Sequence, residues 1–487
     1  HRTGPGSKWS FAHGPPSPNP NRLALRSLPR TPTEDRAMVH RGAILITCAT
    51  ACAGGRPTDH RRPDILLVSL DTVRWDHTSV GGYRHDTTPH LAAFARLRGS
   101  VLFTRAYTDG AWSQPAYVSL FTGQHALSHG VGFRSIDLDP GQATLASMLS
   151  AHGYATRAFV SGPHLSPTTG IDKGFDDYGH EGLLRSIAGQ VDPALDWLTQ
   201  DSDRPRLAFV QGYDAHTPYS VPAAFSGMFE DSPPTEVETC GVPDQRCLTT
   251  PLPRPSGPAL GAAETARLNG AYDAAVAYAD HQLGRLLHGL QTAGRLDDTL
   301  VIVLADHGEM LGEGGGLGHD LGHSDAVFHV PLVVRLPVAA DDPPPARAED
   351  RLVSLSDLLP TLSALLEMTP PSGMDGVPIP ALLPSADPGP AHPHRGASMC
   401  CYYVREGTWS AAAVRGDDTL SWTLFADGSP TDRAAEEPAR LARMQHILGD
   451  WPTRIDEIVE VNQSLGDNDP TLKKALQDGG YWHREGR

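Results

Sequence analysis

The sequence lacks an excess of positive charge. Its 487 residues include 40 Lys and Arg against 57 Asp and Glu, which gives a formal net charge of −17 at pH 7. A general nucleic-acid-binding protein needs a cationic face, so this composition argues against that class. It does not exclude an anionic small-molecule ligand, because a site can be locally positive on an acidic protein.

Cysteine is scarce, and none of the six cysteines belongs to a Cys-x-x-Cys pair. This argues against a zinc site built from cysteines. Cys240 and Cys247 flank a short loop and are close enough in sequence to form a disulfide, whereas Cys400 and Cys401 are adjacent. After residue 62, no apolar run approaches the about 20 residues that a membrane-spanning helix requires.

The start of the chain differs from the rest. Residues 1–37 are rich in Pro, Arg, Gly and Ser without apolar periodicity, which predicts a disordered or spurious extension. Residues 38–62 begin at Met38 and carry a short apolar stretch before Cys52, which is typical of a signal or lipoprotein-type segment and a linker. We predict an exported protein, periplasmic or at the cell surface, with a lipid anchor at Cys52 or, second, at Cys48. The alternative is a disordered tail on a protein that is not exported.

From residue 63 onward, short apolar runs alternate with helix-like segments. Six runs have the continuous apolar character of strands buried on both faces: 64–71, 101–108, 155–162, 206–216, 299–309 and 330–337. Apolar residues three or four apart predict a helix over about 263–292. The alternation predicts an α/β fold, with a mixed, mostly parallel central sheet between helices.

A stretch rich in Pro and Gly, residues 370–397, predicts a linker or a long loop. Shorter strand candidates follow it, together with a predicted helix over 433–448 that is rich in Ala, Arg and Glu. We therefore predict a large catalytic domain over 63–390 and a small α+β domain over 391–487.

Acidic and histidine side chains stand where the predicted strands end. Asp71 follows the first strand, and Asp306 and His307 follow the strand that begins at residue 299. Asp214 and His216 follow the strand that begins at residue 206. In open α/β sheets ligands bind beyond the carboxyl ends of the strands, and Asp and His are ligands of divalent metals. The pattern predicts a metal site there, although a strand-end Asp is also a common helix N-cap.

Ser113 stands at the start of a short predicted helix, with Pro115 in its first turn and Gly123 at its end. Free backbone N–H groups and the helix dipole favour an anion at such a position. A serine oxygen held there beside a divalent metal is a candidate nucleophile. Taken alone, Ser113 is an ordinary N-cap, and only its combination with the predicted metal ligands favours a catalytic role.

Together these segments resemble the sulfatase family of the alkaline-phosphatase superfamily. The resemblance extends from about residue 63 to the end and rests on ordered blocks: DILLVSLDTVRWDHTS, TTPHLAAFA, WSQPAYVSLFTGQ, GYATRAFVSG, DAHTPY, ADHGEMLGE, VPLVV and LKKALQDGGYW. It implies an alkaline-phosphatase-like catalytic domain that hydrolyses sulfate esters. It also implies one divalent metal ion, with Ca²⁺ preferred over Mn²⁺ or Mg²⁺.

The resemblance implies roles residue by residue. Asp71, Asp306 and His307 match the metal ligands of the family. Ser113 matches the catalytic nucleophile, which also contacts the metal. A cation at this position polarises the ester and activates the nucleophile.

Histidines and a tyrosine match the remaining roles. His216 matches a catalytic residue that contacts the substrate anion, and His319 matches the group that faces the leaving group. His323 is close enough in sequence to compete with His319, and we assign it, His164 and Tyr117 to substrate binding. Histidine suits these tasks because its pKa lies near about 6.5.

Three positions depart from the family pattern. The family motif Cys/Ser-x-Pro-x-Arg, whose first residue is oxidised to formylglycine, is Ser113-Gln-Pro115-Ala-Tyr117 here. Tyrosine does not supply the fixed positive charge of a guanidinium group, so the sequence argues against formylglycine at Ser113. Thr72 stands where the family has a second Asp, and Gly162 stands near the place of a family lysine.

These departures leave three hypotheses for function. The first is a sulfatase that acts on an anionic small-molecule or glycan ester. The second is a phosphodiesterase, a phosphonate monoester hydrolase or a phosphoryl-type transferase that uses unmodified Ser113. In that branch Asp214, His216 and one of His319 or His323 would complete a second metal site. The third is a degenerate member that binds an anion without turnover.

Overall fold

The structure is a computed structural model that describes residues 62–449, with gaps at 134, 182–184, 230–244, 247–259, 314–315, 320–321, 339–343, 384–391, 400, 416–419 and 428–430. The predicted signal segment, Cys240, Cys247 and the block LKKALQDGGYW lie outside the described residues. Within the described part, no helix is both long and apolar enough to span a bilayer.

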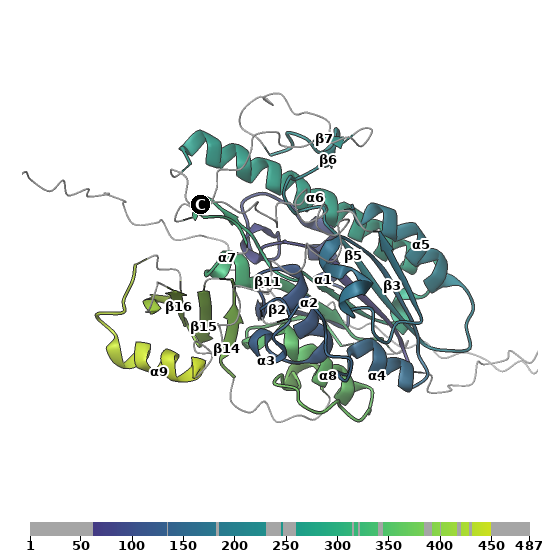
Figure 1. The fold of residues 1–487 in the computed structure, drawn as a ribbon. Helices are drawn as coiled ribbons and strands as arrows, with labels where there is room; N and C mark the ends of the chain where they lie inside the picture. Colours follow the sequence, from purple (N-terminus) through teal and green to yellow (C-terminus); the bar gives the residue numbers. More distant parts are fainter. Residues whose placement is uncertain are drawn as a thin grey trace, which may run out of the picture. The chain divides into compact units, whose positions relative to one another are not determined.

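A nine-stranded sheet forms the centre of the fold (Figure 1). Its order is β12-β2-β11-β8-β1-β5-β3-β4, with β13 also paired to β2. The bounds are β1 Asp64–Leu70, β2 Ser100–Tyr107, β3 Ala155–Ser161, β4 Asp177–Glu181, β5 Arg206–Gly212, β8 Thr299–Leu304, β11 His329–Arg335, β12 Arg347–Glu349 and β13 Val353–Ser354. Only β11 runs antiparallel to its neighbours among these described strands, which confirms the mixed, mostly parallel sheet.

Helices cover both faces of this sheet, as expected for strands that are apolar along their whole length. Figure 1 shows α5 and α6 on one face and α2, α4 and α8 on the other. The helices are α1 Pro89–Ala95, α2 Ser113–Thr122, α3 Ala126–His129, α4 Leu145–Ala151, α5 Ala188–Thr199, α6 Ala262–Thr292, α7 Asp325–Phe328 and α8 Leu358–Leu365. Two short antiparallel strand pairs lie outside the main sheet, namely β6 Val221–Pro222 with β7 Gln245–Arg246 and β9 Met310–Leu311 with β10 Leu317–Gly318.

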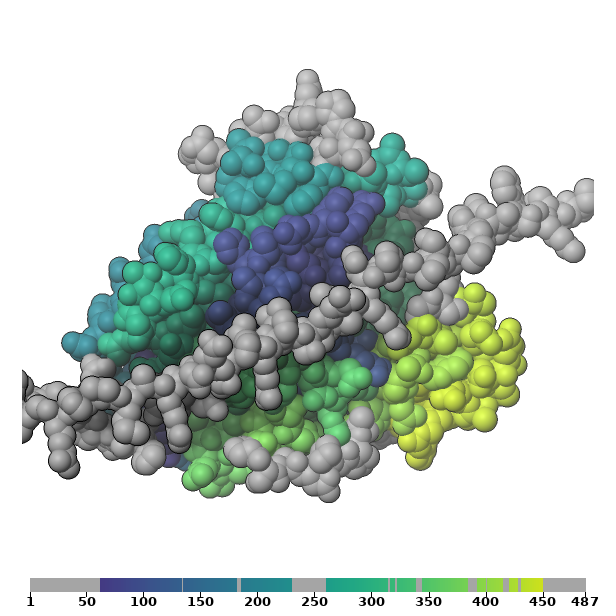
Figure 2. All heavy atoms as spheres, turned by 180° about the vertical axis from the view of Figure 1, so that it is seen from behind, coloured from purple at the N-terminus to yellow at the C-terminus, as the bar shows by residue number. Residues whose placement is uncertain are grey.

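The longest helix, α6, confirms the predicted helix over 263–292 almost to the residue. Its buried stripe includes Leu268, Val276, Leu283 and Leu290, which repeats every seven or eight residues as one helix face should. Helix α1 packs against it. In Figure 2 the early, purple part of the chain reaches the surface beside the teal surface of α6.

The C-terminal part is a four-stranded antiparallel sheet with one helix, which confirms the predicted α+β character. Its elements are β14 His394–Ala397, β15 Cys401–Glu406, β16 Trp409–Arg415, β17 Leu420–Ala426 and α9 Pro438–Leu448. The helix begins at Pro438 rather than at residue 433, because proline lacks an N–H and suits the first turn. Strand β14 lies inside the stretch predicted as a linker, and the boundary at residue 390 stays a prediction.

Candidate active site

Five strand ends meet at one edge of the sheet. Strands β1, β2, β3, β5 and β8 all run in the same direction, so their carboxyl ends lie on the same side. Asp71 follows β1, and Asp306 follows β8. Ser113, His164 and His216 follow β2, β3 and β5 in the same way. The fold therefore gathers at this edge side chains that are far apart in the sequence.

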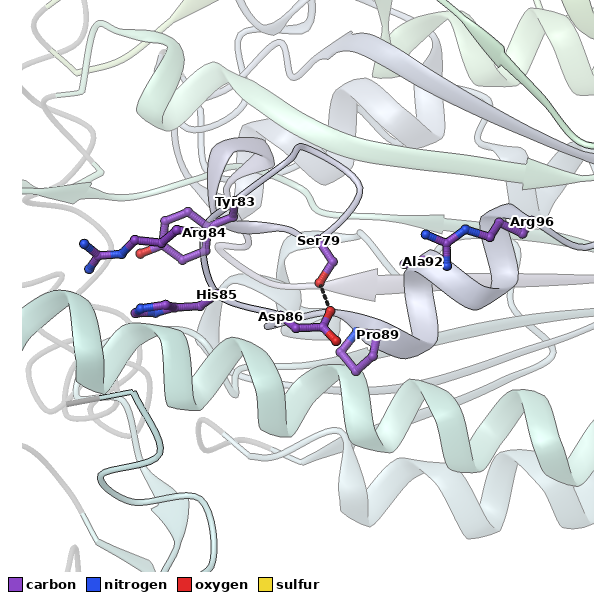
Figure 3. A pocket seen from close by; sticks show the side chains of 8 residues that line it. All are labelled: Ser79, Tyr83, Arg84, His85, Asp86, Pro89, Ala92 and Arg96. Carbon is purple, nitrogen blue, oxygen red and sulfur yellow. Dashed lines mark hydrogen bonds between the residues drawn. The ribbon is translucent and has the colours of Figure 1, made fainter. Parts of the chain in front are cut away.

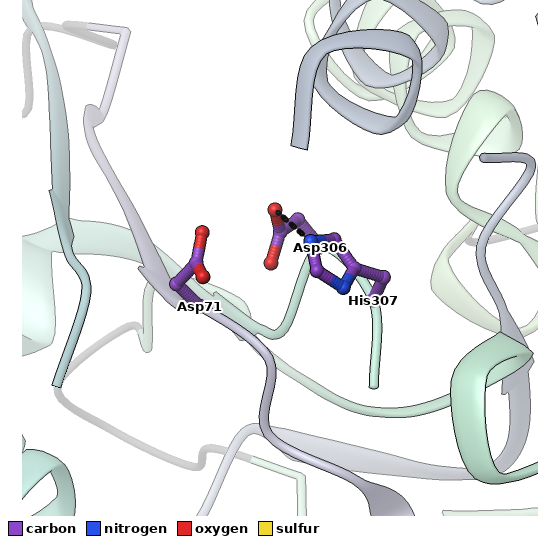
Figure 4. A group of neighbouring side chains, drawn as sticks. All are labelled: Asp71, Asp306 and His307. Atoms are coloured by element: carbon purple, nitrogen blue, oxygen red, sulfur yellow. Dashed lines mark ion pairs between the residues drawn. The ribbon is translucent and has the colours of Figure 1, made fainter. Parts of the chain in front are cut away.

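Asp71, Asp306 and His307 form a buried cluster in which one ligand atom of each lies within 4.8 Å of the others (Figure 4). Nε2 of His307 is 3.4 Å from Oδ2 of Asp306. Nδ1 of His307 lies 2.9 Å from the carbonyl oxygen of Gly308, so it donates there and leaves the Nε2 lone pair for a ligand. Asp214 is not part of any such three-residue cluster within the described chain, which leaves the second metal site without structural support.

The electrostatics of the cluster fit a divalent cation. Burial, and then the neighbouring Asp306, raises the pKa of Asp71, and burial raises the pKa of Asp306 to about 6. Burial, and then His319, lowers the pKa of His307 well below its usual value, so this imidazole is neutral. Oδ1 of Asp71 and Oδ2 of Asp306 have no hydrogen-bond partner among the described residues. Two adjacent buried carboxylates with unpaired oxygens need a positive charge between them, and Asp and His are suitable ligands for it.

Ser113 is the first residue of α2 and is fully buried. The N-cap of the helix is Trp112, which makes no side-chain cap. The Ser113 Oγ lies 3.3 Å from Oδ2 of Asp71 and 3.4 Å from Nε2 of His307. The hydroxyl group therefore faces the metal cluster instead of capping the helix. Gly123 ends the helix in a left-handed conformation, as predicted.

Three further buried histidines surround the cluster, namely His164, His216 and His319. The Nε2 atoms of His319 and His216 are 3.3 Å apart, and the ring centroids of His319 and His307 are 4.4 Å apart. His164 is close enough for its charge to lower the pKa of His307. Two histidines were predicted as candidates to face a leaving group. Of these, His319 contacts His216 and His307, while His323 is partly exposed.

Two contacts that the sequence did not predict hold Asp71 and the next residue, Thr72. Nε2 of Gln211 donates to Oδ2 of Asp71 over 3.4 Å. Thr72 adopts a left-handed conformation with φ 57°, and its carbonyl accepts a 2.7 Å bond from the hydroxyl of Tyr272, which in turn accepts one from the Arg74 N–H. Gln211 interrupts an apolar strand and could have been noticed for that reason. No sequence signal links Tyr272 to Thr72.

Tyr213 is a second residue at this edge that the sequence did not single out. It follows β5 directly and is buried, and a Cβ added to Gly162 would lie 2.1 Å from its ring. Burial raises the pKa of Tyr213 well above its usual value, and Ser113 is close enough to lower it in part. The Tyr213 hydroxyl has no hydrogen-bond partner among the described residues. Its place just before Asp214 and His216 was the signal that could have found it.

Tyr117 and Asp214 lie near the cluster but are bonded elsewhere. The fully buried Tyr117 donates to Oγ of Ser69 over 2.9 Å, and its ring packs edge-on against Phe209. Oδ2 of Asp214 accepts a 2.8 Å bond from the Ile187 N–H, and burial raises the pKa of Asp214 to about 6. A substrate-binding role for Tyr117 stays a prediction.

Cys401 is buried and disulfide-bonded. The other five cysteines lie outside the described residues, so the pairing of Cys240 with Cys247 stays a prediction. A disulfide at Cys401 was not anticipated from the sequence, where only its adjacency to Cys400 was noted.

A separate hollow of about 290 Å³ is formed by the segment between β1 and the end of α1 (Figure 3). Arg84 and Arg96 lie at its opposite ends, and Ser79 donates a 2.6 Å hydrogen bond to Asp86 between them. None of the predicted site residues lines it. The hollow is therefore distinct from the metal cluster.

The fold and the site define the class of protein. A buried Asp–Asp–His cluster lies at the carboxyl edge of a mixed sheet with a serine oxygen facing it, as the resemblance to the sulfatases of the alkaline-phosphatase superfamily implies. The sequence profile of the family described as Sulfatase matches residues 63–368, so this chain belongs to the sulfatase family. It is a hydrolase of ester bonds, which sets aside the hypothesis of a non-catalytic member. The family depends on a divalent metal, for which Asp71, Asp306 and His307 form a possible site.

Similar proteins include both sulfatases and phosphonate hydrolases. The arylsulfatase of Clostridium perfringens is 22% identical over 379 residues, which cover 65% of this chain and 77% of that protein. The structure of the phosphonate monoester hydrolase of Agrobacterium radiobacter superposes with a TM-score of 0.64 at 23% identity, covering 81% of this chain and 96% of the other. A protein solved with its substrate D-glucosamine-2-N,6-O-disulfate superposes with a TM-score of 0.64 at 19% identity, covering 84% and 99%. These solved structures establish the fold.

Proposed function

We propose that this protein hydrolyses sulfate esters with Ser113 as the nucleophile and a divalent metal held by Asp71, Asp306 and His307. The observation that carries the proposal is the position of the Ser113 Oγ, 3.3 Å from Asp71 and 3.4 Å from His307. The hydroxyl lies beside the atoms of Asp71 and His307 that would bind the metal. It can therefore attack the same ester group that a bound metal would polarise.

In this mechanism the Ser113 Oγ attacks the sulfur atom and releases its proton to solvent, and the bond from sulfur to the leaving oxygen breaks. A bound divalent metal supplies Lewis-acid polarisation of the ester and lowers the pKa of the serine hydroxyl. His319, with His216 in contact, donates a proton to the leaving oxygen. Water then displaces the sulfate from Ser113. Gln211 and the Thr72 turn keep Asp71 oriented throughout.

The carboxylate oxygens of the ligand set suit Ca²⁺, Mn²⁺ and Mg²⁺ alike, and the resemblance to the sulfatase family favours Ca²⁺ among them. For the substrate we propose a glycan or another anionic ester. One structural neighbour was solved with a disulfated glucosamine as its substrate, which supports this class.

A second candidate function is hydrolysis of phosphodiesters or phosphonate monoesters. It is favoured by Tyr117, which donates to Ser69 and occupies the place of the arginine in the formylglycine motif. An unmodified serine attacks phosphorus directly, and one structural neighbour is named a phosphonate monoester hydrolase. On this route the reaction passes through a phosphoryl or phosphonyl ester of Ser113.

The two candidates are separated by a panel of aryl esters that share one leaving group. We expect the aryl sulfate to give the highest kcat/KM on metal-loaded protein, ahead of a diaryl phosphate, an aryl phosphonate and an aryl phosphate monoester. The intact mass of Ser113-containing peptides, measured in parallel, reports whether the residue is modified. If kcat/KM for the diester or the phosphonate exceeds that for the sulfate tenfold and Ser113 is unmodified, the second candidate function is established instead.

We also propose export with a lipid anchor at Cys52. The apolar stretch before Cys52 and the disulfide at Cys401 support this, because disulfides persist in oxidising compartments. A Cys52→Ser variant of the full chain is expected to move from the membrane fraction to the soluble fraction, with Cys48→Ser as the matched control. Unchanged partitioning of the Cys52 variant would contradict the anchor.

A further inference from the structure

The Tyr213 hydroxyl is an unused hydrogen-bond donor in the active site. The side chain is buried and its hydroxyl has no hydrogen-bond partner among the described residues. A buried tyrosine hydroxyl normally finds a partner, because leaving it unpaired is unfavourable. The Ser113 hydroxyl approaches it closely enough to lower the raised pKa of Tyr213 in part. The ring centroid of Tyr213 is 5.5 Å from that of His216. The Tyr213 side chain therefore lies close both to the proposed nucleophile and to a histidine of the site.

The chain makes room for this ring at Gly162. A Cβ at this position would lie 2.1 Å from one ring carbon and 2.8 Å from the hydroxyl oxygen of Tyr213. Gly162 also has a φ of 86°, a backbone conformation that residues other than glycine rarely adopt. Glycine is thus required twice, for the backbone conformation and for the space that the Tyr213 ring fills.

We propose that the Tyr213 hydroxyl, whose ring occupies the space that Gly162 leaves free, binds a non-bridging oxygen of the substrate's anionic group. This rests on the proposed function and adds to it the residue that selects the substrate. The hydroxyl comes from the segment after β5, and the segment after the neighbouring parallel strand β3 carries His164. Bound substrate supplies the hydrogen-bond acceptor that the protein itself does not provide.

A tyrosine donor also determines which anions bind best. It donates a hydrogen bond without adding a positive charge, whereas a lysine would add one. The carboxylates of Asp71 and Asp306 already balance a divalent cation. We therefore assign the site to esters with one negative charge, such as sulfate monoesters, phosphodiesters and phosphonate monoesters, over doubly charged phosphate monoesters.

Replacing Tyr213 by Phe tests this assignment. We expect kcat/KM for the preferred singly charged ester to fall about 10²-fold, because one donor to the reacting anion is lost. The midpoint of thermal unfolding should stay the same or rise, because the lost hydroxyl has no partner among the described residues. Tyr154→Phe is the matched control, since its hydroxyl bonds to the Pro63 carbonyl at the other end of β1. Unchanged kcat/KM in the Tyr213 variant would overturn the proposal.

A binding measurement keeps this test separate from the proposed function. Calorimetric titration of metal-loaded protein with inorganic sulfate should give a Kd roughly tenfold weaker in Tyr213→Phe than in wild type, as expected for one lost hydrogen bond to an anion. Gly162→Ala should weaken sulfate binding similarly, and the double variant should be no worse than either single variant, because both act through one ring. Wild-type protein that binds sulfate but hydrolyses no ester in the panel would refute the proposed function only. Equal sulfate affinity in wild type and Tyr213→Phe would refute the role of Tyr213.

Discussion

Ser113→Ala is expected to lower kcat by about 10³-fold or more on the best substrate of the panel, because it removes the attacking oxygen and leaves only binding and electrostatic stabilisation. KM should change little by comparison. Metal content, measured by mass spectrometry of the purified protein, should remain close to that of wild type, since Asp71, Asp306 and His307 are intact. Loss of activity with retained metal would distinguish a nucleophile from a structural residue.

The matched control for this variant is Ser119→Ala on the same helix. Ser119 is buried like Ser113, but its hydroxyl contacts Nε2 of His129 at 3.0 Å and has no place in the proposed reaction. It should keep activity within a few-fold of wild type. If Ser113→Ala retains more than a tenth of the wild-type rate, another group performs the attack and the proposed mechanism is wrong.

Asp306→Ala, and metal removal by a chelator, should each reduce activity by about 10³-fold, which corresponds to about 4 kcal/mol of barrier. The variant should also lose stoichiometric metal. The fold of the variant should survive. In the metal-free protein the Asp306 carboxylate is buried beside Asp71, and burial raises its pKa to about 6. The charged carboxylate is therefore unfavourable in that place, and its removal should not destabilise the fold. Asp192→Ala, which removes an exposed ion pair with Arg285, is the control.

Thermal unfolding gives an independent readout of the same site. Metal at 100 times its dissociation constant should stabilise the folded wild type by about 2.7 kcal/mol and raise its Tm, and it should leave Asp306→Ala unchanged. When metal is added back to wild-type protein from which a chelator has removed it, both the activity and the Tm should be restored. Activity that persists in metal-free protein would contradict the assignment of the cluster.

The sequence predicted most of the sheet because its strands are buried on both faces and therefore read as continuous apolar runs. The predicted runs at 206–216 and 299–309 nevertheless extended too far, since β5 ends at Gly212 and β8 at Leu304. The extra residues are those that turn over the sheet edge and carry the site. Apolar patterning detects burial, and it cannot tell where a buried strand stops pairing.

The sequence predicted those members of the candidate site that are Asp or His residues directly after strands. It did not predict the neutral residues that lie beside them. Asp71, Asp306 and His307 were recognised from their position and from family resemblance. Gln211 and Tyr213 were missed, because a lone polar residue in an apolar strand and a tyrosine after it are usually structural. Their significance depends on the distance to Asp71 and on the unpaired hydroxyl, and neither can be read from a linear sequence.

The two carboxylates of the cluster are far apart in the sequence. The backbone N–H of Thr72, the residue after Asp71, contacts the carboxylate of Asp306, which lies 234 residues later. During synthesis the first aspartate emerges long before the second, and neither alone is a chelate. Ion capture must wait until β8 has paired with β1, which is a late event for so non-local a contact. On the proposed function, the metal available in the compartment where folding ends then decides which ion is bound as much as the ligands themselves do.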